Sequence, residues 1–348
     1  MDKLKKIVSH RLFLPLVALI FLIGYNAIFV ENFFQLSIIN GQLHGRMIDI
    51  LNRAASLVIV SVGMTFVIAT GGIDISVGST MAITGATTAF IVGGAGDGTT
   101  QAPLWLAIAA GLLVGLICGL WNGFLVSKLK IQPIIATLIL QTAGRGIAML
   151  ITQGQIITVY YKPFSYFGNH FPGSPLPTTI FLALTVIIVV GVLLKRTSIS
   201  LFVQSVGINK KASHYSGINV NRVMFMTYIF SGLCAAVGGL IEVSRISAAD
   251  ANNAGLLFES SAIMSVALGG TLLKGGRFSL GGSIIGAITI QTLTTTLYAR
   301  GVSSEQLPFI QGVVIILICL LQSELFRSLF VIKRKQQDKS EERLVKQQ

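Results

Sequence analysis

Charged residues are scarce in this sequence of 348 residues: they make up 11% of it, whereas hydrophobic residues make up 53%. The mean hydropathy is correspondingly high, at +0.78. A soluble domain of this length needs more charge to cover its surface. The composition therefore excludes a soluble globular protein and predicts a membrane protein with several spans.

Acidic residues and cysteines are also few. The 13 Asp and Glu stand against 26 Lys and Arg, for a net charge of +13. The basic excess lies in short loops between apolar runs, as in the positive-inside pattern of membrane proteins, so we expect no nucleic-acid partner. The three cysteines, Cys118, Cys234 and Cys319, each stand alone in an apolar run, which predicts neither a disulfide framework nor a metal site.

Several motifs of catalysis and nucleotide binding are missing. The glycine-rich GGTLLKGG at 269–276 lacks the spacing of a phosphate loop and the hydroxyl residue that follows its Lys. The sequence contains no G-x-S-x-G elbow, no H-E-x-x-H and no plausible triad. We therefore expect that the chain is not an enzyme by itself, that it holds no cofactor, and that any ATP hydrolysis occurs on a partner.

Long apolar runs are what the sequence has in abundance. A run of about 20 such residues crosses a hydrocarbon core of ~30 Å. Candidate spans lie at 12–30, 50–70, 77–93, 103–126, 131–151, 178–194, 223–242, 259–273, 280–298 and 308–326. They predict an all-α fold: one transmembrane domain over 1–348, a polytopic membrane protein of about ten transmembrane helices. The short, glycine-rich run at 259–273 either crosses the membrane or re-enters it.

The basic residues predict which side of the membrane each loop faces. With both termini inside, twenty of the 26 Lys and Arg fall on the cytoplasmic side, five fall on the outer side, and Arg145 lies within a span. This asymmetry predicts a cytoplasmic N-terminus at 1–11, a cytoplasmic loop at 195–222 and a cytoplasmic tail at 327–348.

The chain is organised around a broken apolar stretch, GMTFVIATGGIDISVGSTMAITGA at 63–86. The run breaks at Gly71 and Gly72, places Asp74 and Ser76 at the break, and resumes with small residues. Irregular backbone inside a bilayer occurs where protein or a water-filled cavity satisfies it. Such a break is typical of a helix that lines a transport route.

A second stretch resembles this break. GGRFSLGGSIIGA at 275–287 repeats the Gly-Gly, Ser, Gly and closing Gly-Ala of residues 71–86. Related broken segments in two halves are common in transporters. The likeness indicates either an internal repeat or a chance match in a glycine-rich chain.

The loop at 195–222 contains a short amphipathic piece from Asn209 to Ser216. Asn209 is a favourable N-cap and Gly217 a favourable stop, so the pattern predicts a short helix. Such a helix suits docking on another protein. The alternative is a basic loop that anchors to anionic lipid headgroups.

Three motifs in order resemble the permease subunits of bacterial ribose-type sugar ABC importers. They are GMTFVIATGGIDISVGS, VGINKKASHYSGINVNR and IMSVALGGTLLKGGRFSLGGSIIGA, and the likeness covers nearly the whole chain. IDILNRAA, KIQPIIATLILQTAGRG, ITQGQI and ADANNAGL look most like the galactofuranose importer permeases. The region before Ile48 matches the family least.

The resemblance implies a bacterial inner-membrane permease that passes a monosaccharide of the ribose, galactose or galactofuranose class. The implied partners are an ABC ATPase subunit, an extracytoplasmic sugar-binding protein, a second permease copy or paralogue, and membrane lipid. The segment from Gly207 to Gly217 looks like the family's coupling helix; its candidate residues are Gly207, Asn209, Lys210, Lys211, Ala212, Ser213, Tyr215, Ser216 and Gly217.

Two other functions compete with this one. A secondary transporter driven by an ion gradient fits the broken helices equally well, although paired intramembrane carboxylates are few. A membrane enzyme acting on lipid-linked sugars lacks the carboxylate cluster or His-rich loop that it would need.

Several polar residues of the apolar runs are candidates for the substrate path. Asp74 either contacts sugar hydroxyls or caps the helix that follows the break, with Gly71, Gly72 and Ser76 beside it. Asn122 and Gln141 either line the path or form hydrogen bonds between helices.

Three further candidates are Arg145, within a span, and Asn252 and Asn253, at the predicted outer mouth. Arg145 either pairs with a carboxylate such as Glu242 or Glu259, or donates to a sugar oxygen; pairing is favoured because an unpaired buried charge is costly. The amides of Asn252 and Asn253 could contact sugar hydroxyls or the binding protein. The alternative is that they belong to an ordinary Asx-type turn.

Overall fold

The computed structural model describes residues 12–39, 41–93 and 102–322. The predicted N-terminal segment 1–11 and the predicted tail 327–348 lie outside these residues. The chain divides into two compact units, Met1–Ala299 and Arg300–Gln348, which are described separately.

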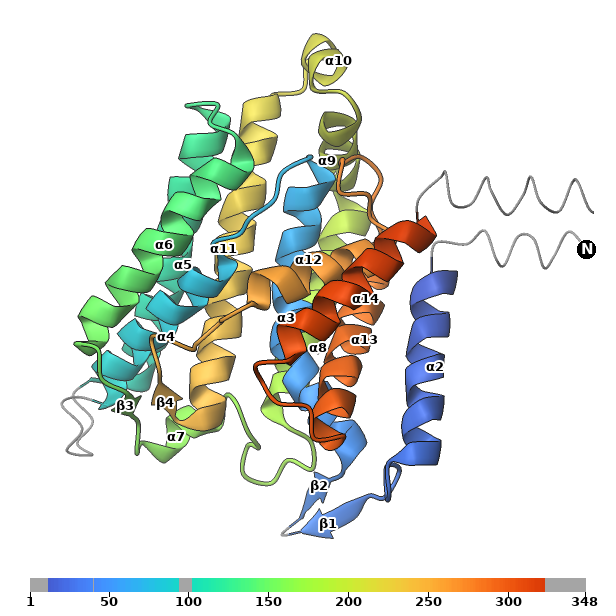
Figure 1. Cartoon of the computed structure of the whole chain (residues 1–348). Coiled ribbons are helices and arrows are strands. Elements are labelled where there is room, and N and C mark those ends of the chain that lie inside the picture. Colours follow the sequence, from blue (N-terminus) through green and yellow to red (C-terminus); the bar gives the residue numbers. More distant parts are fainter. Residues whose placement is uncertain (1–11, 40, 94–101, 323–348) are drawn as a thin grey trace, which may run out of the picture. The chain divides into compact units, whose positions relative to one another are not determined.

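The described chain is mostly helical (Figure 1). In the first unit the helices are α2 (Phe13–Phe29), α3 (Arg46–Ala69), α4 (Val77–Gly93), α5 (Leu104–Ser127), α6 (Pro133–Thr152), α7 (Lys162–Ser165), α8 (Thr178–Arg196), α9 (Ile199–Ile208), α10 (Lys210–Tyr215), α11 (Val220–Ile246), α12 (Phe258–Leu268) and α13 (Leu280–Ala299). The second unit contains α14 (Leu307–Gln322).

Two small antiparallel strand pairs, of which the first is a hairpin, depart from the all-α expectation. Strand β1 (Ser37–Ile39) pairs with β2 (Gln42–His44), and β3 (Ile157–Thr158) pairs with β4 (Ala248–Ala249). They join loops rather than build a core, and sequence analysis missed them because strands of two or three residues leave no periodic pattern.

Each predicted span overlaps a helix, but the helices differ in length. Within the described residues, α3, α5, α6, α8, α11 and α13 are long and apolar enough to cross a membrane. Helix α12 has 11 residues and is about 16 Å long at 1.5 Å per residue, too short for ~30 Å of hydrocarbon. A helical, polytopic membrane protein is thus confirmed, whereas the count of ten stays a prediction.

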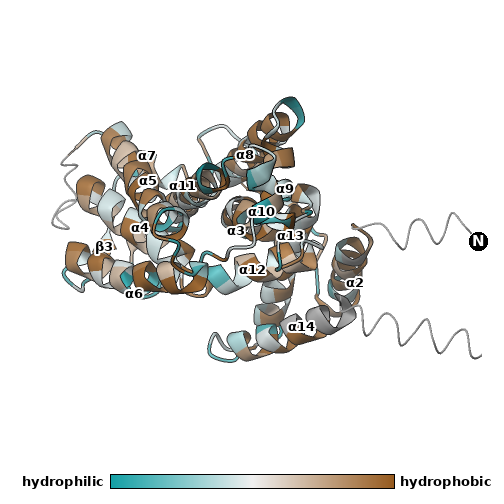
Figure 2. Cartoon of the chain, turned by 90° about the horizontal axis from the view of Figure 1, so that it is seen from above, coloured by the Kyte–Doolittle hydropathy of each residue, from teal (hydrophilic) through white to brown (hydrophobic). Residues whose placement is uncertain are grey.

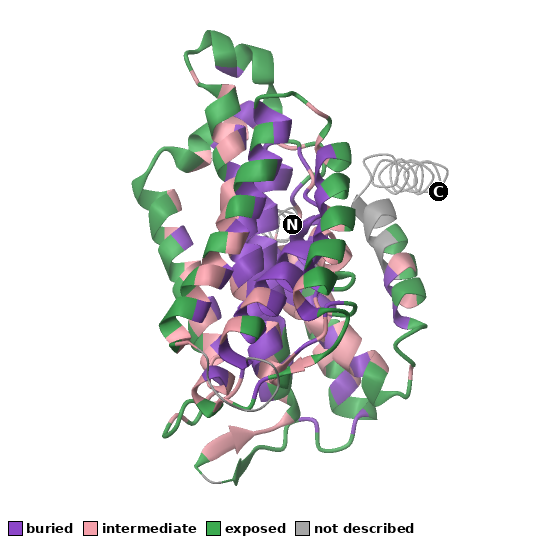
Figure 3. Cartoon of the chain, turned by 90° about the vertical axis from the view of Figure 1, so that its left-hand side faces the viewer, coloured by how far each residue is buried: buried purple, intermediate pink, exposed green. Residues whose placement is uncertain are grey.

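Helices α3 and α11 form the centre of the first unit, where the buried residues gather (Figure 3). Helix α3 is buried on all sides from Ala54 to Ala69, as expected of a helix surrounded by others. Glycines let α11 approach α5 closely: a Cβ on Gly232 would overlap the backbone of Gly115. Helices α6 and α8 expose large apolar side chains such as Leu138 and Ile188. Figure 2 colours much of α6 and α8 as hydrophobic.

The loops of the first unit lie at two ends (Figure 1). One end carries α10, and Lys130 of the α5–α6 connection lines a pocket there with Lys210 and Lys211. The other end carries the β1–β2 hairpin, the β3–β4 pair and α7 (Figure 1). We call these the α10 end and the hairpin end. The predicted cytoplasmic loop at 195–222 and the α5–α6 connection thus share one end.

Candidate functional site

The break between α3 and α4 is built around Asp74. Helix α3 ends at Ala69, and Gly71 takes a left-handed φ of +78° that turns the chain away from the helix axis. The buried Asp74 side chain, 2% exposed, accepts hydrogen bonds from the amide of Ser76 (3.0 Å) and from the hydroxyls of Ser76 (2.7 Å) and Ser231 (2.8 Å). This Asx-type turn satisfies the open backbone just before α4 begins.

Asn122 of α5 extends this polar cluster. Its Nδ2 donates to the Ser76 hydroxyl (2.7 Å) and to Asp74 Oδ1 (3.5 Å). Its Oδ1 and the hydroxyl of Tyr228 are buried without a hydrogen-bond partner, and the Tyr228 hydroxyl leaves no room for a Cβ at Gly72. The break is therefore tied to α5 and α11, and two polar atoms beside it stay open to a ligand or water.

Sequence analysis did not single out Tyr228 and Ser231 of α11, although both lie in this cluster. Three residues apart, they share one face of the helix. Polar residues with that spacing in an apolar helix are the signal that could have found them.

The hydrogen bonds of Arg145 in α6 go to backbone carbonyls. Its Nη1 donates to the carbonyl oxygens of Ala251 (3.0 Å) and Ala254 (2.5 Å). The predicted pair with Glu242 is wrong, because Glu242 lies one turn from Arg245 on α11 and forms its ion pair there. The guanidinium thus satisfies carbonyls that the irregular turn before α12 leaves open.

Glu259, the other predicted partner of Arg145, interacts with its charge through space and accepts a hydrogen bond from Gln141. The Nε2 of Gln141 donates to Oε1 of Glu259 at 3.0 Å. The second carboxylate oxygen, Oε2, is buried without a hydrogen-bond partner. Glu259 lies in the first turn of α12, where the helix dipole favours a negative charge.

Asn252 and Asn253 lie in a turn organised by Asp250. The Oδ1 of Asp250 accepts the backbone amides of Asn252 (3.0 Å) and Asn253 (3.2 Å), and Oδ2 accepts the side-chain amide of Asn253 (2.7 Å). Burial raises the pKa of Asp250, but these hydrogen bonds outweigh it and hold the pKa below its usual value. The Asn253 amide is therefore engaged within the turn, whereas the Asn252 side chain lies exposed.

Helix α10 protrudes from the first unit (Figure 1). Asn209 caps it by accepting the amide of Ala212 at 3.0 Å, and Gly217, with φ of +82°, follows its end. The Ser213 side chain is buried, whereas Tyr215 is 87% exposed. Exposed side chains also include Lys210, Lys211, Ala212 and Ser216. The predicted cap and stop of this helix are confirmed; the preceding helix α9 was not anticipated, because its apolar residues were assigned to a loop.

Three backbone segments meet at Gly207, near the end of α9. A Cβ on Gly207 would overlap the carbonyl oxygen of Ala69 and the amide nitrogen of Gly276. That carbonyl accepts the Gly276 amide at 2.8 Å, and Gly275 lies against the backbone of Gly71. This glycine junction brings together the two Gly-Gly pairs of the repeated stretch, and it joins both to the element that carries α10.

The chain matches, over residues 46–319, the family described as branched-chain amino acid transport system / permease component. It is 44% identical over 316 residues to the galactofuranose transporter permease protein of Escherichia coli K12, with 90% of each chain covered. It is 37% identical over 348 residues to the fructose import permease protein of Bifidobacterium longum, with 98% of this chain and 96% of that one covered.

The ribose import permease protein of Escherichia coli K12 is 36% identical over 312 residues, covering 89% of this chain and 92% of that one. No solved structure matches the chain. The resemblance to sugar importer permeases that the motifs indicated is confirmed by these relatives. The family match spans most of the chain, and the chain therefore belongs to this family of transport-system permease components.

Proposed function

We propose that this chain is the membrane permease of an ABC importer that takes up a monosaccharide. The observation that carries the proposal is the similarity to permeases named for galactofuranose, fructose and ribose, each over about nine tenths of the chain or more. The family description mentions branched-chain amino acids, but these relatives favour a sugar. The identity to the galactofuranose permease makes galactofuranose the first sugar to test.

The substrate path is proposed to pass the break between α3 and α4. Asp74 already accepts hydrogen bonds from Ser76, Asn122 and Ser231, which supports a structural role for this carboxylate. Buried polar atoms without partners, namely Asn122 Oδ1, the Tyr228 hydroxyl and Glu259 Oε2, are better placed to meet sugar hydroxyls. Gln141 and Arg145 then hold Glu259 and the turn before α12 in position.

ATP hydrolysis is proposed to reach the membrane through α10. The exposed helix provides a docking surface, and the adjoining pocket is lined by Lys130, Lys210, Lys211 and His214, which suits acidic groups of an ATPase. A movement of α9 and α10 would be transmitted through the glycine junction to both broken segments, at 71–72 and at 275–276. We accordingly propose that the α10 end faces the cytoplasm, that both termini are also cytoplasmic, and that the hairpin end faces an extracytoplasmic binding protein.

A tagged chain, extracted gently from native membranes, tests the proposal. We expect an ATPase subunit to co-purify, together with either a second copy of this chain or a similar permease. Uptake of radiolabelled galactofuranose should need ATP and should persist when a protonophore is added with ATP held constant. Recovery of the chain alone, still active with an imposed ion gradient and no ATP, would instead show a secondary transporter.

A further inference from the structure

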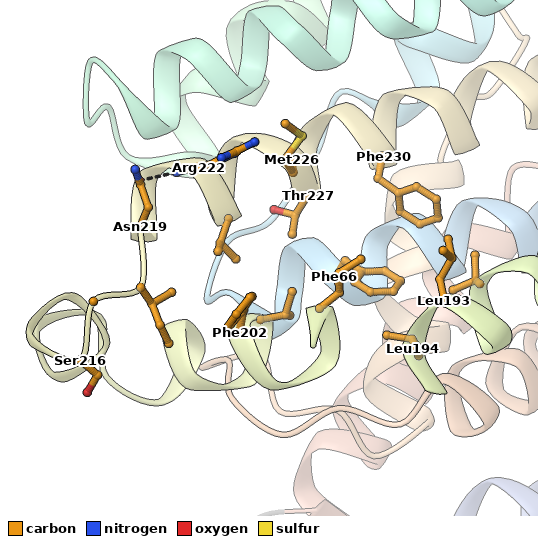
Figure 4. Close-up of a pocket in the computed structure, with 16 residues that line it drawn as sticks. Phe66, Leu193, Leu194, Phe202, Ser216, Asn219, Arg222, Met226, Thr227 and Phe230 are labelled. Carbon is orange, nitrogen blue, oxygen red and sulfur yellow. Dashed lines mark hydrogen bonds between the residues drawn. The ribbon is translucent and has the colours of Figure 1, made fainter. Parts of the chain in front are cut away.

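An apolar groove of about 770 Å³ runs between α8, α9 and α11 (Figure 4). Its apolar part includes Phe66, Leu193, Phe202, Val223, Met226 and Phe230. Exposed side chains line it from three helices, because Leu193, Phe202 and Met226 all keep more than a third of their surface accessible. The residues that line the groove include none from α10 and none from the glycine junction.

The groove is polar at one end. Ser216 and Asn219 lie at the end near α10, whereas Phe66, Phe230 and Leu193 lie at the opposite end (Figure 4). Arg222 carries the only charge among the sixteen lining residues, and its side chain pairs with no carboxylate within the described residues.

Other positive groups surround this polar end. The first turn of α11 begins there and adds the positive end of the helix dipole. The neighbouring pocket, which shares Asn219 and Gly217 with the groove, contributes Lys210 and Lys211. An occupant with a negative head is therefore favoured over a neutral or zwitterionic one.

The length of the groove matches one leaflet of a membrane. From Arg222 to Phe230 along α11 is about 12 Å at 1.5 Å per residue. One leaflet contributes about 15 Å of hydrocarbon, half of the bilayer core. With the α10 end at the cytoplasmic surface, as proposed above, its charge would lie at headgroup level and its apolar walls at the level of acyl chains.

We propose that the groove binds an anionic phospholipid from the leaflet at the α10 end. The phosphate is held at Arg222 and the first turn of α11, and one acyl chain lies between Phe202 and Phe230. The bound chain fills the space between α9 and α11, and so supports the helix that leads into α10. The proposal needs the membrane placement given above but does not depend on which substrate is transported.

Photolabelling of the full-length chain in vesicles tests this site. The probe is phosphatidylglycerol with a diazirine at the end of one acyl chain, added in trace amount to phosphatidylcholine vesicles with a minor share of phosphatidylglycerol. We expect labelled peptides from α9 and the first half of α11. Substitution Arg222→Gln should lower this labelling about fivefold, as expected for loss of one cation at a membrane surface.

Two variants keep the test decisive. Arg196→Gln removes a cation from the end of α8 that does not line the groove, and should leave the labelling unchanged. Met226→Trp keeps Arg222 but fills the groove, and should lower the labelling as well. Each variant is compared after size-exclusion chromatography, so that only folded protein is scored.

Three results would overturn the proposal. One is equal labelling by the matching phosphatidylcholine probe on the unaltered chain, which requires no variant to fold. Another is labelling that Arg222→Gln leaves unchanged. The third is a cross-link from the groove to a second copy of the chain or to the ATPase in place of lipid, which would assign this surface to a protein interface.

Discussion

At the scale of single residues, Asp74 shows how a carboxylate can stabilise an irregular segment without contacting substrate. Its carboxylate oxygens accept hydrogen bonds from the Ser76 amide and from the hydroxyls of Ser76 and Ser231, all of which are buried. Asp74→Ala leaves these donors unsatisfied, at about 1–3 kcal/mol for each. We expect the thermal midpoint in detergent to fall in the order wild type, Asp74→Asn, Asp74→Ala, because Asn keeps one acceptor oxygen.

Ser231→Ala is the matched control for Asp74, since it removes one donor and leaves the carboxylate in place; its midpoint should lie above that of Asp74→Ala. If Asp74→Asn unfolds at the wild-type temperature but abolishes sugar uptake, the structural role is wrong and Asp74 contacts substrate. If it keeps both assembly and uptake, a contact between its charge and the sugar is excluded.

Arg145 and Glu242 should contribute to the stability of the chain independently of each other. The Arg145 guanidinium binds the carbonyls of Ala251 and Ala254, whereas Glu242 forms its ion pair with Arg245. Arg145 and Glu242 therefore form no ion pair with each other. Arg145→Gln should destabilise the chain by about 1.5–3 kcal/mol, the range for hydrogen bonds to a charged group. In a double-mutant cycle with Glu242→Gln, the unfolding free energies should add within about 0.5 kcal/mol. Rescue by exchanging the two charges would restore the ion-pair hypothesis.

At the scale of elements, the glycine junction predicts that α9 tolerates no side chain where it meets the two broken segments. Gly207→Ala must push α9 away from Ala69 and Gly276. We expect the ATPase still to co-purify, because α10 is unchanged, but transport to fall at least tenfold relative to ATP hydrolysis, a loss of about 1.4 kcal/mol in coupling. Gly191→Ala, in α8 with open space around it, is the control and should transport normally.

The N-cap of α10 allows a second prediction at this scale. Asn209→Ala removes the side chain that accepts the Ala212 amide, at a cost of about 1 kcal/mol. A helix of 6 residues has little other stabilisation, so ATPase recovery after purification should drop. Asn219→Ala removes the equivalent cap of α11, a helix of 27 residues held by packing, and should leave recovery near normal. Equal recovery from both variants would contradict docking through α10.

At the scale of the whole molecule, the prediction concerns orientation. Tyr215 near the α10 end and Tyr160 near the hairpin end are both exposed. In a background without Cys118, Cys234 and Cys319, a cysteine at 160 should react with an impermeant maleimide on intact spheroplasts. A cysteine at 215 should react only after permeabilisation. The reverse pattern would place the α10 end outside and remove it from any cytoplasmic ATPase.

The sequence by itself determined the features that depend on residues close together in the chain. Hydropathy sums along a segment, so the membrane class and the positions of the apolar helices could be predicted. The cap and stop of α10 lie within nine residues, from Asn209 to Gly217, and were predicted for the same reason. Helix α9 was missed because an apolar segment of ten residues is too short for a span and resembles a loop between two spans.

Only the tertiary structure decided which distant residues share a contact. Ser231 is 157 positions from Asp74, and Ala251 is 106 from Arg145, so neither partner leaves a local pattern. The glycine junction and the apolar groove likewise arise where helices from separate parts of the chain pack together. Hydrogen bonds and steric fit act over a few ångströms in space whatever the separation in sequence, which is why the sequence did not predict the backbone carbonyls that Arg145 binds.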